Sequence, residues 1–213
     1  MKIFNVFLCL MACVLCSCTN TDDDYNTNKV NETPVISEYI LPDTDYSISS
    51  KEFLSLFSEK SWKLVRLEYI LEDGSVLDHV TIDGVDYDLL EIGVDGMSLP
   101  NFSVTGDSRI KEYIYVDDVP SAWVNGLCYD LGNFTYDECN NLLTIQMNSF
   151  KESWLNGKHR ILQLNDDELV VSCNVFLSKS IGKDVQYGIL KYRCMTEEEQ
   201  FYFDENYKKK VAN

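Results

Sequence analysis

The sequence has few cationic side chains and few of the residues that usually bind metals. It holds 18 Lys and Arg against 35 Asp and Glu, which gives a formal net charge of −17. Such a surface repels phosphate backbones and anionic headgroups, so we expect no nucleic-acid partner and no electrostatic attraction to lipid. Only two histidines are present, His79 and His159, and no Cys-x-x-Cys follows residue 18. We therefore expect neither a metal site nor a cofactor.

Recognisable catalytic motifs are also missing. There is no Gly-x-Ser-x-Gly elbow, no His-Glu-x-x-His and no phosphate-binding glycine loop. Both histidines fall on strand-like patterns, where a single histidine is more often structural than catalytic. One acidic group offers oxygen ligands but lacks the glycine register of a calcium loop; it comprises Asp83, Asp86, Asp88 and Glu91. We interpret this group as the solvated face of a strand, and we predict no catalytic residues and no enzymatic activity.

No apolar run near the start is long enough to cross a membrane as a helix. The run Ile3–Leu15 follows Lys2 and is shorter than the about 20 residues that a bilayer requires. These are the proportions of a secretory signal. The run ends in Leu15-Cys16-Ser17-Cys18, which resembles the lipobox of bacterial lipoproteins. The resemblance implies cleavage after residue 17 and a lipid anchor on Cys18, with several acyl chains giving durable membrane binding. An ordinary cleaved signal peptide is the alternative.

The residues after the signal predict a tether. Thr19–Asp24 ends in three aspartates, and this resembles the surface-export signal of some Gram-negative lipoproteins. That resemblance implies an outer-membrane lipoprotein exposed at the cell surface; a solvated acidic linker on a periplasm-facing lipoprotein is the alternative. We predict a signal at 1–17, an acidic and polar tether at 18–47 and one domain at 48–213. Loss of the signal removes Lys2 and no carboxylate, so the net charge becomes −18.

Cysteine usage agrees with export to an oxidising compartment. Four of the eight cysteines lie at or before residue 18, and Cys128, Cys139, Cys173 and Cys194 remain. An even number suggests two disulfides, for which three connectivities exist. We predict Cys128–Cys139 and Cys173–Cys194, because each pair brackets an expected turn. Four buried free thiols are the alternative.

The pattern after residue 48 predicts an all-β, mainly antiparallel domain. Asp73-Gly74 and Asp83-Gly84 separate apolar runs, which is a strong hairpin signal because these turns need positive φ. Ile110, Glu112, Ile114 and Val116 share one side of an expected strand. We expect strands at 62–71, 76–82, 85–94, 110–116, 134–136, 142–147, 150–155, 158–164, 168–177 and 185–195, with a long loop at 117–133. So many short, closely spaced strands favour a closed barrel or a sandwich.

A helix is predicted at each end of this domain. Ser49 and Glu52 have capping-box spacing, and apolar residues at 53, 56 and 57 follow at helical spacing. Thr196 and Glu199 repeat the capping box before a C-terminal helix. We expect residues 203, 207 and 211 to face the strands, and Lys208–Lys210 to lie at the negative end of the helix dipole.

Three segments together resemble the lipocalin-like domains of bacterial lipoproteins. They are Leu142–Met147, Arg160–Val171 and Leu190–Arg193, preceded by a short helix that runs into Trp62-Lys63-Leu64. The resemblance implies a β-barrel over residues 50–195, with Trp62 plugging its closed end and Arg193 stacked on the indole as a cation–π pair. The sequence departs from lipocalins proper at Lys60, where they place glycine.

This resemblance implies a non-enzymatic protein that binds a small, partly apolar ligand inside the barrel. We expect Ile114, Cys173 and Val175 to line the interior, and Trp123, in the long loop, to lie at the barrel mouth. Packing within the core is the alternative role for these residues. A second reading is a barrel filled by its own side chains, which acts through its outer surface on a protein partner. A third is glycan hydrolysis by some of the many carboxylates.

Overall fold

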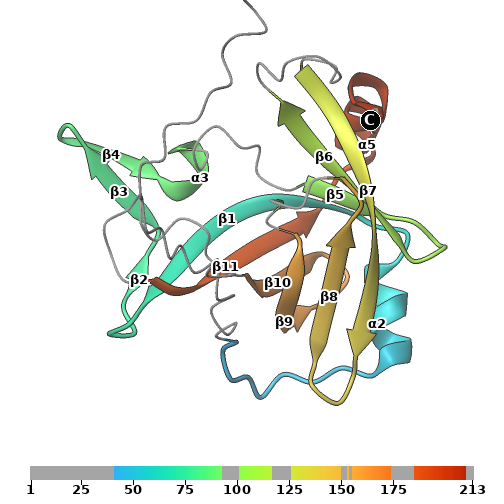
Figure 1. Cartoon of the computed structure of the whole chain (residues 1–213), viewed down its shortest axis with the longest axis horizontal. Coiled ribbons are helices and arrows are strands. Elements are labelled where there is room, and N and C mark those ends of the chain that lie inside the picture. The colour runs from blue at the N-terminus through green and yellow to red at the C-terminus, as the bar shows by residue number, and fades with distance from the viewer. Residues whose placement is uncertain are drawn as a thin grey trace, which may run out of the picture. The chain divides into compact units, whose positions relative to one another are not determined.

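Eight antiparallel strands close into a barrel in the computed structural model (Figure 1). The structure describes residues 41–92, 101–116, 126–149, 153, 155–173 and 185–209. Around the barrel, β1, β5, β6, β7, β8, β9, β10 and β11 follow one another, and β11 pairs back onto β1. Their bounds are Ser61–Leu71, Asn101–Val104, Arg109–Val116, Gly126–Asp137, Leu142–Met147, Gly157–Leu164, Glu168–Cys173 and Val185–Cys194. An up-and-down barrel of eight strands is the lipocalin arrangement, so the predicted fold class is confirmed.

The predicted signal, Cys18 and most of the tether lie outside the described residues. The end of the tether is described, and it contacts the barrel. The Tyr46 hydroxyl donates a hydrogen bond to the Leu164 carbonyl (2.8 Å), and the Asn141 side-chain amide donates to the Tyr46 carbonyl (3.0 Å). Ile48 is buried in the core. Within the described residues, no helix is both long and apolar enough to cross a membrane.

The two rims of the barrel differ in the length of their connections. At one rim, which we call the short-turn rim, the strands are joined at 105–108, 138–141 and 165–167. At the other, the long-connection rim, the segments between strands are 72–100, 117–125, 148–156 and 174–184. Ligands of small barrels enter at the mouth, so the long-connection rim is where a site is expected.

Aromatic side chains close the short-turn rim. Helix α2 (Ser50–Phe57) begins at Ser49, whose hydroxyl accepts from the Glu52 amide (3.3 Å). Phe53 and Phe57 are fully buried, and the Phe57 ring lies 6.4 Å from the Trp62 ring. Burial of each of these side chains stabilises the fold by roughly 1.5–3 kcal/mol. The indole therefore sits where the lipocalin resemblance places a plug.

Residues 76–92 depart from the predicted meander of barrel strands. Only β2 (Val76–Leu77) pairs with β1, whereas β3 (His79–Ile82) and β4 (Val85–Asp88) form a separate two-stranded sheet. Helix α3 (Leu89–Ile92) replaces the end of the strand expected at 85–94. Val85 and Tyr87 are exposed, so this hairpin buries little of its apolar surface, although Val80 of β3 packs against the core.

Four further differences from the sequence-based expectations are found. Strand β5 lies in a stretch for which no strand was predicted, and β7 occupies much of the expected loop at 117–133. The strand expected at 150–155 is not found at Ser153 or Leu155. Helix α5 (Glu197–Asn206) begins with the predicted capping box but ends before the lysines. Lys208–Lys209 form β12 instead, paired parallel to β7.

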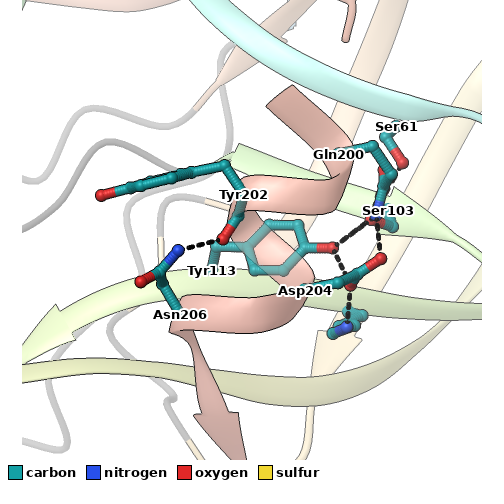
Figure 2. Close-up of polar contacts among 8 residues, drawn as sticks. Ser61, Ser103, Tyr113, Gln200, Tyr202, Asp204 and Asn206 are labelled. Atoms are coloured by element: carbon teal, nitrogen blue, oxygen red, sulfur yellow. Dashed lines mark hydrogen bonds and ion pairs between the residues drawn. The ribbon is translucent and has the colours of Figure 1, made fainter. Parts of the chain in front are cut away.

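Helix α5 covers the outer face of β5 and β6, and Figure 2 shows the polar contacts that hold it there. The Tyr113 hydroxyl lies 2.7 Å from the Ser103 hydroxyl and donates to Asp204 (3.0 Å), while Gln200 donates to Tyr113 (3.0 Å). Lys111 adds an ion pair to Asp204. The Tyr113 ring also packs on Phe203 and Tyr207. The polar groups of this network bond to one another, so the network holds α5 against β5 and β6.

The predicted disulfides are not formed. Cys139, Cys173 and Cys194 are free thiols. Cys173 lies opposite Gly188, six residues along β11 from Cys194, which is roughly 20 Å in an extended strand. Cys128 lies nine residues before the end of β7, so about 30 Å of strand separates it from the turn that holds Cys139. A disulfide needs Cα atoms within about 7 Å, so both pairings were wrong.

Candidate functional site

Buried polar side chains gather inside the barrel. Those on strands face inward because they share one side of the strand with apolar core residues: Glu112, for example, follows Ile110 by two positions. We call this group the interior polar cluster; it comprises Tyr69, Glu112, Asp130, Ser153, His159, Cys173 and Tyr192. Six barrel strands, which are far apart in sequence, and the β8–β9 connection therefore contribute to one interior site. The strands are β1, β6, β7, β9, β10 and β11.

Two carboxylates form the acidic part of the cluster. Glu112 of β6 and Asp130 of β7 are direct cross-strand partners and are only 1% and 5% exposed. The Ser153 hydroxyl donates to Glu112 Oε1 (2.6 Å), and the backbone amides of Leu131 and Ser149 donate to Asp130 (2.9 Å each). Directly opposed side chains have Cβ atoms about 5 Å apart, and two full charges at that distance repel by about 3 kcal/mol at an effective dielectric constant of ~20.

The β8–β9 connection folds against this interior. Leu155 is buried, and its amide donates a hydrogen bond to the Ser153 hydroxyl oxygen (3.0 Å). His159 Nε2 lies 2.7 Å from the Leu155 carbonyl, and Nδ1 lies 2.8 Å from the Ser172 carbonyl. Burial lowers the pKa of His159, while the two carbonyls act in the opposite direction. Because both ring nitrogens face acceptors of the chain itself, His159 ties the connection to β10 and is not placed as a free base.

Two polar atoms deep in the barrel have no hydrogen-bond partner among the described residues. They are the Tyr192 hydroxyl and Trp62 Nε1, on side chains that are both 0% exposed. Burial raises the pKa of Tyr192 well above its usual value, and the nearby Cys173 and Glu112 raise it further. A buried polar group without a partner costs about 1–3 kcal/mol. A polar molecule held inside the barrel would remove this cost.

Cys173 sits at a close approach between three strands. A Cβ added to Gly188 would lie 2.5 Å from Cys173 Sγ and 3.5 Å from the Tyr69 ring, so only glycine fits opposite the thiol. Burial raises the pKa of Cys173 to about 12. The thiol is therefore uncharged at neutral pH and lacks the thiolate that a nucleophile requires. Within the described residues, no group of three or more His, Cys, Asp or Glu could hold a metal ion.

The structure brings only part of the predicted site together. Cys173 faces the interior, as expected, and the backbone of Ile114 lies in β6 opposite Cys128. The Ile114 side chain, Trp123 and Val175 lie outside what the structure describes.

The predicted cation–π partner of Trp62 was wrong. Lys60 Nζ lies 5.9 Å from the indole centroid, whereas Arg193 forms a two-pronged ion pair with Glu199 (2.7 Å for each bond). In the β1–β11 register, Trp62 pairs with Cys194 and Lys63 with Arg193. Neighbouring strand residues face opposite sides, so Arg193 projects away from the indole.

Six residues of the cluster were not predicted as site residues, namely Tyr69, Glu112, Asp130, Ser153, His159 and Tyr192. Glu112 gave a usable signal, because it shares the apolar side of its strand with Ile110. Asp130 fell in an expected loop, and Ser153 in an expected strand. Nothing in the local pattern marks Tyr192 as different from other buried tyrosines.

The chain matches no protein-family model and no sequence among the curated proteins. Among solved structures it is similar to Japanin from Rhipicephalus appendiculatus bound to cholesterol. The two share 11% identity over 73% of this chain and 92% of that chain, with a TM-score of 0.35. This likeness establishes no shared activity. The fold assignment rests on the strand order and the closure of the barrel.

Proposed function

We propose that the barrel binds a small, partly apolar molecule in its interior and performs no chemistry on it. The observation that carries this proposal is the pair of buried polar atoms without partners, the Tyr192 hydroxyl and Trp62 Nε1. They lie among apolar walls that include Phe102 and Leu190, both buried. Binding sites of this kind combine apolar lining with a few orienting polar groups.

The state of the two most reactive residues supports a binding role. His159 has both ring nitrogens against backbone carbonyls, and Cys173 is held as a neutral thiol by burial. Neither residue has the arrangement of a nucleophile beside an available base.

Native mass spectrometry tests the binding proposal. The full chain carrying Cys18→Ala, which prevents acylation, is incubated with an envelope extract of lipids and glycans. We expect one adduct of defined mass per chain. A bare protein mass under every condition, for a protein with native circular dichroism, would contradict the proposal. Glycan fragments released from the pool would instead favour hydrolysis.

A lipid anchor on Cys18 and an outer-membrane, surface-exposed position form the second part of the proposal. Its support is the lipobox resemblance of Leu15–Cys18 and the acidic residues that follow it. The intact mass of the chain isolated from a bacterial envelope should lack residues 1–17 and carry acyl chains, and protease added to whole cells should remove it. A Cys18→Ala chain still bound to the membrane would contradict the anchor.

A barrel that works through its outer surface is the second candidate. Phe201 and Tyr202 on α5 are 67% and 54% exposed, an unusual exposure for two adjacent aromatic residues. If this candidate is correct, no small-molecule adduct forms, and exchange of both residues for serine abolishes cross-linking to an envelope protein while leaving the thermal midpoint unchanged.

A further inference from the structure

A chain of hydrogen bonds crosses the interior of the barrel through the β8–β9 connection. The Ser153 hydroxyl donates to Glu112 Oε1 on β6 (2.6 Å) and accepts from the Leu155 amide (3.0 Å). The Leu155 carbonyl faces His159 Nε2 of β9 (2.7 Å), and His159 Nδ1 faces the Ser172 carbonyl of β10 (2.8 Å). In the ring of eight strands, β6 and β10 lie on opposite sides. We call Ser153 and Leu155 the cross-barrel bridge.

His159 is the member of this chain that holds the bridge through its imidazole ring, and it is 1% exposed. A neutral imidazole carries a proton on one of its two nitrogens, so it donates to only one of the two carbonyls at a time. A second proton would let it donate to both, but it would also place a full positive charge in a site that water does not reach. Burial lowers the pKa of His159, so the cost of that charge outweighs the second hydrogen bond.

The groups that surround His159 decide which way a proton acts. No carboxylate among the described residues contributes to the lowered pKa of His159. β8, whose Leu143 is the direct cross-strand partner, has no titratable side chain, and neither have the described residues of the β8–β9 connection. Lys158 and Arg160 flank His159 along β9 and project from the outer face. The titratable side chains that β1, β6, β7, β10 and β11 place in the interior are Tyr69, Glu112, Asp130, Cys173 and Tyr192.

We infer that His159 makes the cross-barrel bridge sensitive to acid: the neutral ring keeps Ser153 and Leu155 across the interior, and a proton on the ring releases them. Because the pKa of His159 is lower with the bridge closed than in water, protons favour the open form. Opening should become easier as the pH falls below about 6.5, the ordinary pKa of histidine. This inference concerns regulation of the proposed binding site. It rests on that proposal only for its consequence, which is faster entry and release of a ligand in acid.

Amide hydrogen exchange in the ligand-free full Cys18→Ala chain tests the inference. The protection factor of the Leu155 amide measures how often the bridge opens, after the intrinsic effect of pH on exchange is divided out. We expect this factor to fall about 5- to 30-fold between pH 8 and pH 5, since about 30-fold is the limit for one group with an ordinary pKa of about 6.5. The amides of β1 should remain more strongly protected than Leu155 at pH 5, because the bridge opens without unfolding of the barrel.

The chain has two histidines, and they supply the matched variants. His159→Gln removes the titrating group and keeps a neutral donor for one carbonyl, so the protection factor of Leu155 should change less than about 2-fold between the two pH values. His79→Gln is the control. His79 is exposed and lies 2.8 Å from Asp78, which raises its pKa, and its replacement should leave the pH response of Leu155 unchanged. In that variant His159 is the only histidine, so its ring signals in NMR spectra are assigned without alteration of the interior, and they should report a pKa below about 6.5.

Three results would overturn the inference. The first is a pH response that persists in His159→Gln, which would assign it to another interior group such as Glu112. The second is a protection factor of Leu155 that does not change with pH in the unaltered interior, and the third is a ring pKa of His159 above about 6.5. If His159→Gln does not fold, the second and third readouts still decide, because they use chains that keep His159. None of these readouts involves a ligand, so the adduct experiment tests the proposed binding function separately.

Discussion

Replacement of Tyr192 by phenylalanine isolates the unpartnered hydroxyl. The change removes one buried oxygen and keeps the ring, which packs edge-on against Phe102 at 5.2 Å. No carbon atom is lost, so no sizeable cavity is created. Because the hydroxyl has no hydrogen-bond partner among the described residues, its removal should stabilise the ligand-free protein by about 1–3 kcal/mol. For a domain of this size, each kcal/mol corresponds to about 2–4 °C in the thermal midpoint.

The matched control is Tyr113→Phe. Tyr113 is also fully buried, but its hydroxyl bonds to Ser103, Asp204 and Gln200 (Figure 2). Its removal leaves those groups without a partner, so the free energy of unfolding should fall by about 1–3 kcal/mol. Urea unfolding and calorimetry measure both variants in the ligand-free chain. The reasoning is refuted if Tyr192→Phe destabilises the protein as much as Tyr113→Phe does.

Tyr192→Phe should also weaken binding of the ligand that mass spectrometry identifies, so stability and affinity move in opposite directions. Gly188→Ala should destabilise the protein by about 1–3 kcal/mol because its Cβ would meet Cys173 Sγ at 2.5 Å, and Cys173→Ala should relieve part of that cost in a double-mutant cycle of urea unfolding. Arg193 and Lys63 hold the pKa of Glu199 far below its usual value, so stability from this ion pair is complete above about pH 4.5 and is lost as the pH falls; Glu199→Gln should flatten the acid limb of a stability–pH curve. Alkylation under native conditions should modify the exposed Cys139 quickly and the buried Cys173 only after unfolding; protection of Cys139 would contradict the assignment of a free, exposed thiol.

Strands with regular alternation were predicted well from the sequence. The strand expected at 142–147 has the bounds of β8, and those expected at 158–164 and 110–116 differ from β9 and β6 by one residue. In β8, buried positions alternate with more exposed ones, which is the pattern that sequence reasoning detects. Local alternation therefore sufficed wherever one strand face meets solvent.

Strand β7 was missed for a physical reason that also explains the missed site. Its inward positions include Asp130 and Gly132, which interrupt the apolar pattern of a barrel strand. Gly132 faces Met147 so closely that an added Cβ would lie 2.6 Å from the sulfur atom. The polar and glycine positions that shape the interior are thus the ones that make the strand resemble a loop.

The remaining wrong predictions, the disulfides and the cation–π pair, depended on which strands pair and in which register. The disulfide expectation treated nearby turns as if they brought cysteines together, whereas the register of β10 and β11 keeps Cys173 beside Gly188 and away from Cys194. The same register places Arg193 on the face opposite Trp62. Distance along the chain does not determine which side chains lie on the same face of the sheet. That is determined by the pairing and register of the strands in the closed barrel.

The most direct test of the central claim is a crystal structure of the full Cys18→Ala chain with the ligand that mass spectrometry identifies. The account predicts one molecule inside the barrel, with a polar atom within hydrogen-bond distance of the Tyr192 hydroxyl. A molecule bound only on the outer surface, with the interior unchanged, would contradict it.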